Sequence, residues 1–195
     1  MPKIIDNPEY QNAEEASGGG NFSQMLPGLY KLRIMAIRTE GTDFNGKKVD
    51  YVADKQYVKL VYDVAEGEFA GKYSDEYWAG EDKDYGHCDY LSLKNFGFLK
   101  HKLSVISACN PGFDAEVVFD ADNWAQFIGR EFWAVLDGEV DTNDKGYDRW
   151  KLSVGDYVKP EDAEAGKHRE PKITDNRTAA PETSTNEVYD DIPFM

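Results

Sequence analysis

Apolar and polar residues alternate along four stretches of the chain, and this period of two predicts β-strands that each bury one face. The first two stretches are residues 28–37 and 56–65. Their expected inward side chains are Tyr30, Leu32, Ile34 and Ala36, then Val58, Leu60, Tyr62 and Val64. Their outward neighbours include Lys31, Arg33, Tyr57 and Lys59. If the two strands pair, these basic and aromatic side chains share one surface.

The other two alternating stretches lie in the second half of the chain, at residues 130–140 and 147–158. In the first of them Phe132, Ala134 and Leu136 are expected inward, with Trp133 and Val135 outward. In the second, one face carries Trp150, Leu152 and Val154, and the other carries Tyr147, Arg149 and Lys151. A further strand is expected near residues 72–78, after a turn that Gly67 and Gly71 indicate, but its inward face is ambiguous.

Between these groups of strands the apolar spacing changes from two to three and four. The residues at this spacing are Leu91, Phe96, Leu99, Leu103 and Ile106. They predict a helix over residues 92–108 that ends at Asn110-Pro111-Gly112. A second short helix is expected through Trp124, Phe127 and Ile128, capped by Asp120 or Asp122 and ended by Gly129. Residues 39–54, with the turn pair Asn45-Gly46, read as a polar loop.

Three strands, a helix and two hairpin-joined strands form the element order of the OB-fold. We therefore expect a mainly β protein with one or two helices and an OB-fold-like five-stranded barrel. Other small β-barrels and sandwiches with an inserted helix produce a similar order.

The two ends of the chain differ from this body in composition. Residues 1–24 contain a Gly-Gly-Gly run and read as a flexible N-terminal arm, which leaves residues 25–159 for the folded domain. From residue 160 to 187 the only large apolar side chain is Ile173, so we expect a disordered acidic tail over 160–195. Apolar residues return in its last eight positions as Val188, Tyr189, Ile192 and Phe194. This pattern favours a tethered docking peptide.

The net charge of −15 first argues against a nucleic-acid partner, because phosphate affinity comes mainly from Lys and Arg. The charge is unevenly distributed, however. Residues 63–90 hold nine acids and two lysines, whereas residues 25–62 hold seven basic residues and four acids. A local basic face on an acidic protein is therefore compatible with the sequence, and the acidic tail could compete for that face when DNA is absent.

The end of the tail resembles a known family. Its sequence Asp190-Asp191-Ile192-Pro193-Phe194 is similar to the C-terminal tip of bacterial and phage single-stranded DNA-binding proteins, where the tip recruits replication, recombination and repair enzymes. In that family the final Phe carries the terminal carboxylate, whereas Met195 follows it here. The body also resembles phage proteins of this kind in three turn-containing motifs: Pro27-Gly28-Leu29-Tyr30, Glu66-Gly67-Glu68-Phe69-Ala70-Gly71 and Gly129-Arg130-Glu131-Phe132.

A sequence-tolerant binder of single strands needs aromatic rings on which bases stack and cations beside them. Outward aromatic residues next to Lys or Arg fit this need. The candidate DNA-binding residues are Lys31, Arg33, Tyr57, Lys59, Trp133, Tyr147, Arg149 and Lys151. The candidate residues for docking a partner protein are Asp190, Asp191, Ile192, Pro193 and Phe194. Packing beneath a loop or against another subunit would explain each outward aromatic residue equally well.

Catalytic motifs are missing from the sequence: it has no Gly-X-X-X-X-Gly-Lys-Ser/Thr, no Gly-X-Gly-X-X-Gly and no Gly-X-Ser-X-Gly. The only two cysteines, Cys88 and Cys109, lack the spacing of a zinc site with His87 and His101. We therefore expect no enzyme activity, no cofactor and no metal. Without an apolar run of membrane length or a secretion signal, the expected compartment is the cytoplasm.

The expected function is single-stranded DNA binding by a phage or prophage protein that recruits host or phage replication, recombination and repair partners through its tip. An acidic protein-interaction or inhibitory module without DNA binding remains an alternative. An enzyme with a metal held by the acids between Asp75 and Asp89 is a second alternative. The sequence leaves the oligomeric state open, a homo-oligomer included.

Overall fold

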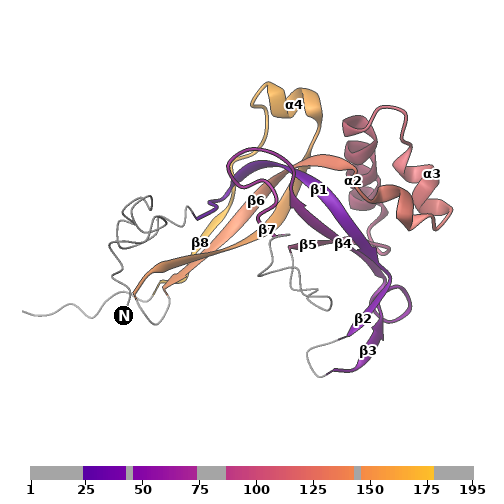
Figure 1. The fold of residues 1–195 in the computed structure, drawn as a ribbon, viewed down its shortest axis with the longest axis horizontal. Helices are drawn as coiled ribbons and strands as arrows, with labels where there is room; N and C mark the ends of the chain where they lie inside the picture. The colour runs from indigo at the N-terminus through magenta and orange to yellow at the C-terminus, as the bar shows by residue number, and fades with distance from the viewer. Residues whose placement is uncertain (1–23, 43–45, 74–86, 143–145, 178–195) are drawn as a thin grey trace, which may run out of the picture.

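The computed structural model describes residues 24–42, 46–73, 87–142 and 146–177. Five antiparallel strands curl into a nearly closed barrel in the order β5-β4-β1-β6-β7 (Figure 1). Their bounds are β1 Gly28–Arg38, β4 Tyr57–Val64, β5 Cys88–Ser92, β6 Glu131–Thr142 and β7 Asp148–Val158. The expected mainly β, OB-like fold is confirmed.

The register of β1 confirms the inward faces expected for β4 and for β1 as far as Ile34. The expectation for Ala36 is wrong, because the pairing shifts after Ile34 and Ile37, opposite the buried Leu60, packs against the core in its place. Leu32 pairs with Val64 and Ile34 with Tyr62, and all four side chains are buried. A bulge between Ile34 and Ala36 then shifts the pairing with β4. Bulges bend a strand and increase its twist, so β1 can pair with β6 through its first half and continue along β4 through its second.

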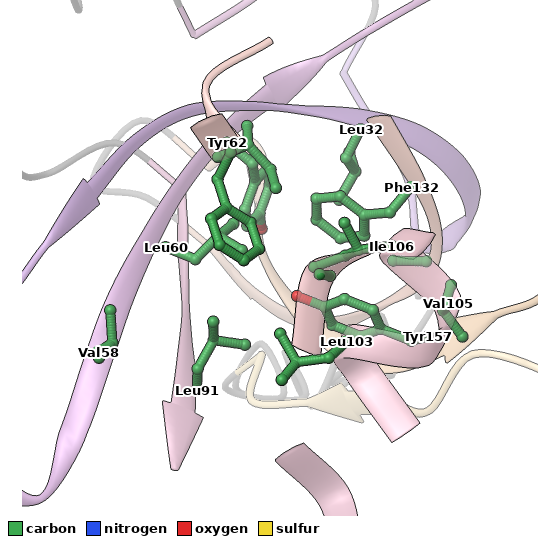
Figure 2. Close-up of a cluster of buried hydrophobic side chains, with 14 of the residues drawn as sticks. Leu32, Val58, Leu60, Tyr62, Leu91, Leu103, Val105, Ile106, Phe132 and Tyr157 are labelled. Carbon is green, nitrogen blue, oxygen red and sulfur yellow. The ribbon is translucent and has the colours of Figure 1, made fainter. Parts of the chain in front are cut away.

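Helix α2, Phe96–Cys109, packs onto the barrel and contributes Leu103 and Ile106 to its core. Figure 2 shows these two side chains facing Phe132 of β6 and Tyr157 of β7. The Phe132 and Tyr157 rings stack at 4.7 Å between centroids. Burial of large apolar side chains contributes about 1.5–3 kcal/mol each and is the main source of stability in such a core.

The same helix bridges the open seam of the barrel. Strands β5 and β7 are the two edges of the sheet and lie close without a hydrogen-bonded ladder. His101 Nε2 lies 3.0 Å from the carbonyl oxygen of Tyr157 on β7, and Lys102 Nζ donates to the carbonyl oxygen of Tyr90 on β5 at 3.0 Å. Side chains of α2 thus satisfy backbone acceptors that neighbouring strands satisfy elsewhere.

Two hairpins project from the barrel in different directions (Figure 1). The first consists of β2 Glu40–Thr42 and β3 Lys48–Asp50, followed by the π-helical turn η2, Tyr51–Lys55. This hairpin occupies much of the segment that reads as a polar loop in the sequence. The second is the long β6–β7 hairpin, to which the strand β8, Ile173–Asp175, adds in parallel along β6.

The expectation of a disordered tail from residue 160 onward is wrong for residues 160–177. Helix α4, Pro160–Glu164, follows β7, and β8 pairs with residues 138–140 of β6. Ile173 is 60% exposed, so apolar burial does not order this segment. Instead Arg169 forms two 2.8 Å bonds with Asp137, and Gly138 N–H donates to Lys172 O at 2.9 Å. A sequence prediction based on buried apolar residues does not detect a segment that is ordered by backbone pairing and ion pairs. We call residues 167–177 the C-terminal strap.

Several other expectations need correction. The third strand of the barrel is β5; Lys72 and Tyr73 lie in a turn, and the rest of the strand expected at 72–78 lies outside the described residues. Leu91 belongs to β5 rather than to the helix, which begins only at Phe96, after the cap Asn95. A short apolar stretch can belong either to a strand or to the end of a helix, and periodicity does not distinguish the two. The apolar spacing alone therefore assigns Leu91 to the wrong element.

The short helical region also differs from the expectation. Helix α3, Ala115–Asp120, is capped by Asp114, and the 3-10 turn η3, Trp124–Phe127, follows it. Val135 was expected outward but is fully buried, although it does not belong to the main core cluster. Helix α4 packs against β6 and covers part of the outer face of the barrel. No helix in the described part of the chain has the length and apolar character needed to cross a membrane.

Candidate nucleic-acid interface

The structure divides the eight candidate DNA-binding residues among three places. Tyr57 and Lys59 lie on the outward face of β4, where it pairs with β5, but Lys59 is only 7% exposed. Lys31, Arg33 and Trp133 lie on the outward face of β1 and β6. Tyr147, Arg149 and Lys151 lie on the β6–β7 hairpin, Tyr147 immediately before β7 and the other two on it. The sequence patterns place each residue on its strand, but they do not predict this separation.

On the first surface, Tyr57 is the middle member of a group of three rings. Its ring stacks on Tyr51 at 5.3 Å between centroids with an interplanar angle of 25°, and the edge of Tyr90 approaches it at 4.6 Å. We call Tyr51, Tyr57 and Tyr90 the tyrosine cluster. Tyr51 is buried, Tyr57 is half-buried and Tyr90 is 46% exposed, so the cluster offers ring surface mainly through Tyr57 and Tyr90.

The start of η2 holds Tyr51 in place. Its N–H donates to Thr39 O at 2.7 Å, and Asp50 caps the turn by accepting from Ala53 N–H at 2.8 Å. The ring lies over Gly41, where a Cβ atom would overlap the Tyr51 side chain. Gly41 therefore makes the close approach of the ring to the β2–β3 hairpin possible.

Lysine and arginine side chains accompany the tyrosine cluster. Lys59 lies opposite Tyr90 and Arg38 in the ladders of β4, and its ammonium group is 5.9 Å from the centre of the Tyr51 ring. The phenols of Tyr57 and Tyr90 are both neutral at pH 7, as a tyrosine with its ordinary pKa of about 10 would be, and burial raises the pKa of each further. The neutral, partly exposed rings of Tyr57 and Tyr90 suit the bases of a single strand.

The second surface is electrostatically different, because its cations are paired with acids. Glu131 binds Arg33 at 2.8 Å and Lys31 at 3.3 Å, and Lys31 also contacts Glu66 at 3.4 Å. Burial opposes ionisation of Glu131, but the bonds from Arg33 and Lys31 outweigh it and lower the pKa of the carboxyl group. Trp133 is half-buried with Lys31 5.8 Å from its ring. A phosphate would have to displace Glu131 to reach these cations.

The third surface also contains paired charges. Arg149 forms a two-point contact with Asp141 at 2.9 and 3.1 Å, which lowers the pKa of that carboxyl group. Lys151 lies opposite Glu139 in the β6–β7 ladder. Tyr147 is 67% exposed at the start of β7. This surface is accessible, but the structure does not bring it together with the tyrosine cluster.

Sequence reasoning missed Tyr51 and Tyr90. Tyr90 alternates with the inward Leu91 within β5, so a strand assignment for residues 88–92 would have found it. Tyr51 lies in an irregular turn whose sequence carries no strand or helix period, and only the fold brings it to Tyr57. The docking residues Asp190, Asp191, Ile192, Pro193 and Phe194 lie outside the described residues, as do residues 1–23 of the N-terminal arm and residues 75–86 of the acidic loop.

A scan against models of known protein families finds no match for this chain, and a search among curated proteins finds none either. Within residues 24–42, 46–73, 87–142 and 146–177, no three His, Cys, Asp or Glu side chains gather closely enough to hold a metal ion.

Proposed function

We propose that this protein binds single-stranded DNA through the tyrosine cluster, without enzymatic activity. The observation that carries this proposal is the close packing of Tyr51, Tyr57 and Tyr90 on the outward face of β4 and β5, next to Lys59. The strand 2 and 3 face of an OB-fold barrel is the one that commonly binds oligonucleotides, and here β4 and β5 are the second and third strands of the barrel. The β2–β3 and β6–β7 hairpins correspond in position to the two loops that border such a face.

We further propose that the protein is of the phage or prophage type, acts in the cytoplasm and recruits replication, recombination and repair proteins. The support is the resemblance of Asp190-Asp191-Ile192-Pro193-Phe194 to the tip of that family. The described chain ends at Arg177, which is bound to Asp148 on the β6–β7 hairpin at 3.0 Å. The last described residue before the tip therefore lies at this hairpin.

The DNA-binding proposal is tested by fluorescence anisotropy with a labelled oligo-dT, at low and at moderate salt. Base stacking contributes about 1–3 kcal/mol per base, so Tyr57→Ala and Tyr90→Ala should each weaken binding about 5- to 150-fold. Phe96→Ala is the matched control, because Phe96 is 72% exposed on α2, outside the cluster. Circular dichroism verifies that each variant is folded.

Two outcomes would contradict the proposed site. If a folded double variant with Tyr57→Ala and Tyr90→Ala binds DNA with wild-type affinity, the tyrosine cluster does not contact the DNA. A large loss on Tyr147→Ala alone would assign binding to the β6–β7 hairpin instead.

The recruitment proposal is tested separately by pull-downs from host extracts. The intact protein should capture replication or repair proteins that Phe194→Ala and a chain lacking residues 189–195 do not capture, because buried aromatic anchors dominate peptide docking. Capture of the same proteins by all three would show that the tip does not recruit them. Removal of Met195 should strengthen docking if the partner binds a terminal Phe carboxylate.

A further inference from the structure

The seam of the barrel contains a pocket of about 330 Å³ between β5, the first half of α2 and the end of β7. Tyr90 and Ser92 line it from β5, Phe98, His101 and Lys102 from α2, and Asp156 from β7. Pockets for small ligands occupy about 300–1,000 Å³, so this one is of a size for one small ring system.

The pocket is continuous with the tyrosine cluster. Tyr90 belongs to both, since its ring packs against Tyr57 and its side chain also lines the pocket. Ser92 pairs with Tyr57 in the β4–β5 ladder and lies two residues after Tyr90, so it projects from the same outward face of β5. A strand of DNA that passes over the tyrosine cluster therefore reaches the pocket across Tyr90 and Ser92.

The charges in the pocket do not suit a phosphate. Lys102 is bound to Asp89 at 2.5 Å and to the carbonyl oxygen of Tyr90, so its cation already has an anionic partner. Asp156 adds a carboxylate at the pocket wall, 3.7 Å from His101. An incoming phosphate would meet this carboxylate and find no uncompensated cation among the lining residues named here.

The same lining suits an uncharged, planar base. Phe98 is 66% exposed and, with Tyr90, offers an aromatic surface for stacking. The Ser92 hydroxyl can donate or accept a hydrogen bond, and the Asp156 carboxylate accepts from a base donor such as the N3–H of thymine or the exocyclic amine of cytosine. Stacking plus hydrogen bonds to a base edge is the way in which proteins hold an unstacked base.

We propose that this pocket receives the base of one nucleotide, next to the nucleotides that stack on the tyrosine cluster. This inference rests on the proposed DNA binding and adds a distinct subsite to it. The base enters between Phe98 and Tyr90, while its phosphate stays outside the pocket.

Phe98 and Phe96 form a matched pair for the test. Both are exposed phenylalanines in the first turn of α2, but only Phe98 lines the pocket. We expect Phe98→Ala to weaken binding of a long oligo-dT at least 5-fold and Phe96→Ala to leave it unchanged. For an oligonucleotide shortened until it covers only the tyrosine cluster, the difference between the two variants should disappear.

A cross-linking experiment gives an independent result. Oligonucleotides with 5-iododeoxyuridine at successive positions are irradiated with the protein, and the adducts are mapped by mass spectrometry. One position should cross-link to Phe98 or Tyr90, and Phe98→Ala should remove a Phe98 adduct.

The failure of this inference is distinguishable from failure of the proposed function. If Tyr57→Ala weakens DNA binding but Phe98→Ala behaves as Phe96→Ala and no pocket residue cross-links, the pocket holds no base while the tyrosine cluster remains a DNA site. If neither Tyr57→Ala nor Phe98→Ala changes affinity, both ideas are wrong. Loss of partner-protein capture on Phe98→Ala, with unchanged DNA binding, would make the pocket a protein-docking site and would also overturn the inference.

Discussion

Gly155 on β7 provides the most direct test of the C-terminal strap. Its φ angle is not positive, so alanine fits the backbone conformation. A Cβ atom at this position would, however, overlap the guanidinium group of Arg169 and the carboxylate of Asp137. Gly155→Ala should therefore separate the ion pair that joins the strap to β6.

The expected cost follows from the contacts that would be lost. Arg169 and Asp137 share two bonds of 2.8 Å, and their side chains are 29% and 21% exposed. Hydrogen bonds to charged groups contribute about 1.5–3 kcal/mol when buried, and exposed ion pairs about 0–1 kcal/mol. Because this pair is partly exposed, it should contribute about 1–2 kcal/mol to the free energy of unfolding. The smaller entropy of the unfolded alanine chain offsets about 0.4–1 kcal/mol, and steric strain adds about 1–3 kcal/mol. We expect Gly155→Ala to lower the unfolding free energy by about 1–5 kcal/mol in total.

A double-mutant cycle separates this mechanism from a general effect of the extra methyl group. With Arg169→Ala already present, Asp137 can rotate away, so adding Gly155→Ala should cost less than half as much as in the wild type. Urea denaturation measures the four unfolding free energies, and an unchanged slope against urea concentration confirms comparable transitions. Gly97→Ala in α2 is the control, because a Cβ atom there meets only an ordinary contact and should stabilise the helix by about 1 kcal/mol.

If Gly155→Ala lowers the unfolding free energy equally with and without Arg169, or does not lower it at all, the methyl group does not act by separating the Arg169–Asp137 ion pair. Amide hydrogen exchange adds a local measure. The N–H groups of Gly138 and Asn176 bond between β6 and the strap, so they should exchange faster in Gly155→Ala if the strap is released.

Three further predictions concern the core, acid stability and the phosphate path. Phe132→Ala should lower the unfolding free energy by about 3–5 kcal/mol in urea, because this ring is fully buried; a loss below 1 kcal/mol would contradict the packing. Bonds from Arg169 and other partners outweigh burial and lower the pKa of Asp137 in the folded state, so its contribution is present above pH 4 and is lost as pH falls through the folded pKa. The urea concentration at the unfolding midpoint should decrease as the pH is lowered from 6 to 3, and it should decrease less in Arg169→Ala. Equal decreases in the two proteins would refute this assignment. Replacing Arg33 by Gln should leave the slope of log affinity against log salt unchanged, because Glu131 already neutralises Arg33. A slope lower by about one unit would mean that DNA displaces Glu131.

Local alternation was enough to predict the inward side of β4, of β1 before its bulge, and of most of β6. The alternation around Leu32, Leu60 and Phe132 requires one buried face, and all three side chains are fully buried. This information is local, because the side chains of a strand point to opposite sides with a period of two. The same alternation was enough to expect an OB-like barrel, and it placed Tyr57 and Lys59 on the outward face of their strand.

Strand order and register in the folded protein set which outward side chains share a surface and which charges are paired. Glu131 is almost 100 residues from Arg33 in sequence, yet strand pairing makes it the partner that neutralises this cation. Tyr51 and Tyr90 reach Tyr57 from a turn and from a strand that carry no clear sequence signal. The strap is ordered by Asp137 and the backbone of β6, although its own composition predicts disorder. Contacts of this kind depend on register and on strand order, and these are properties of the whole fold rather than of any one segment.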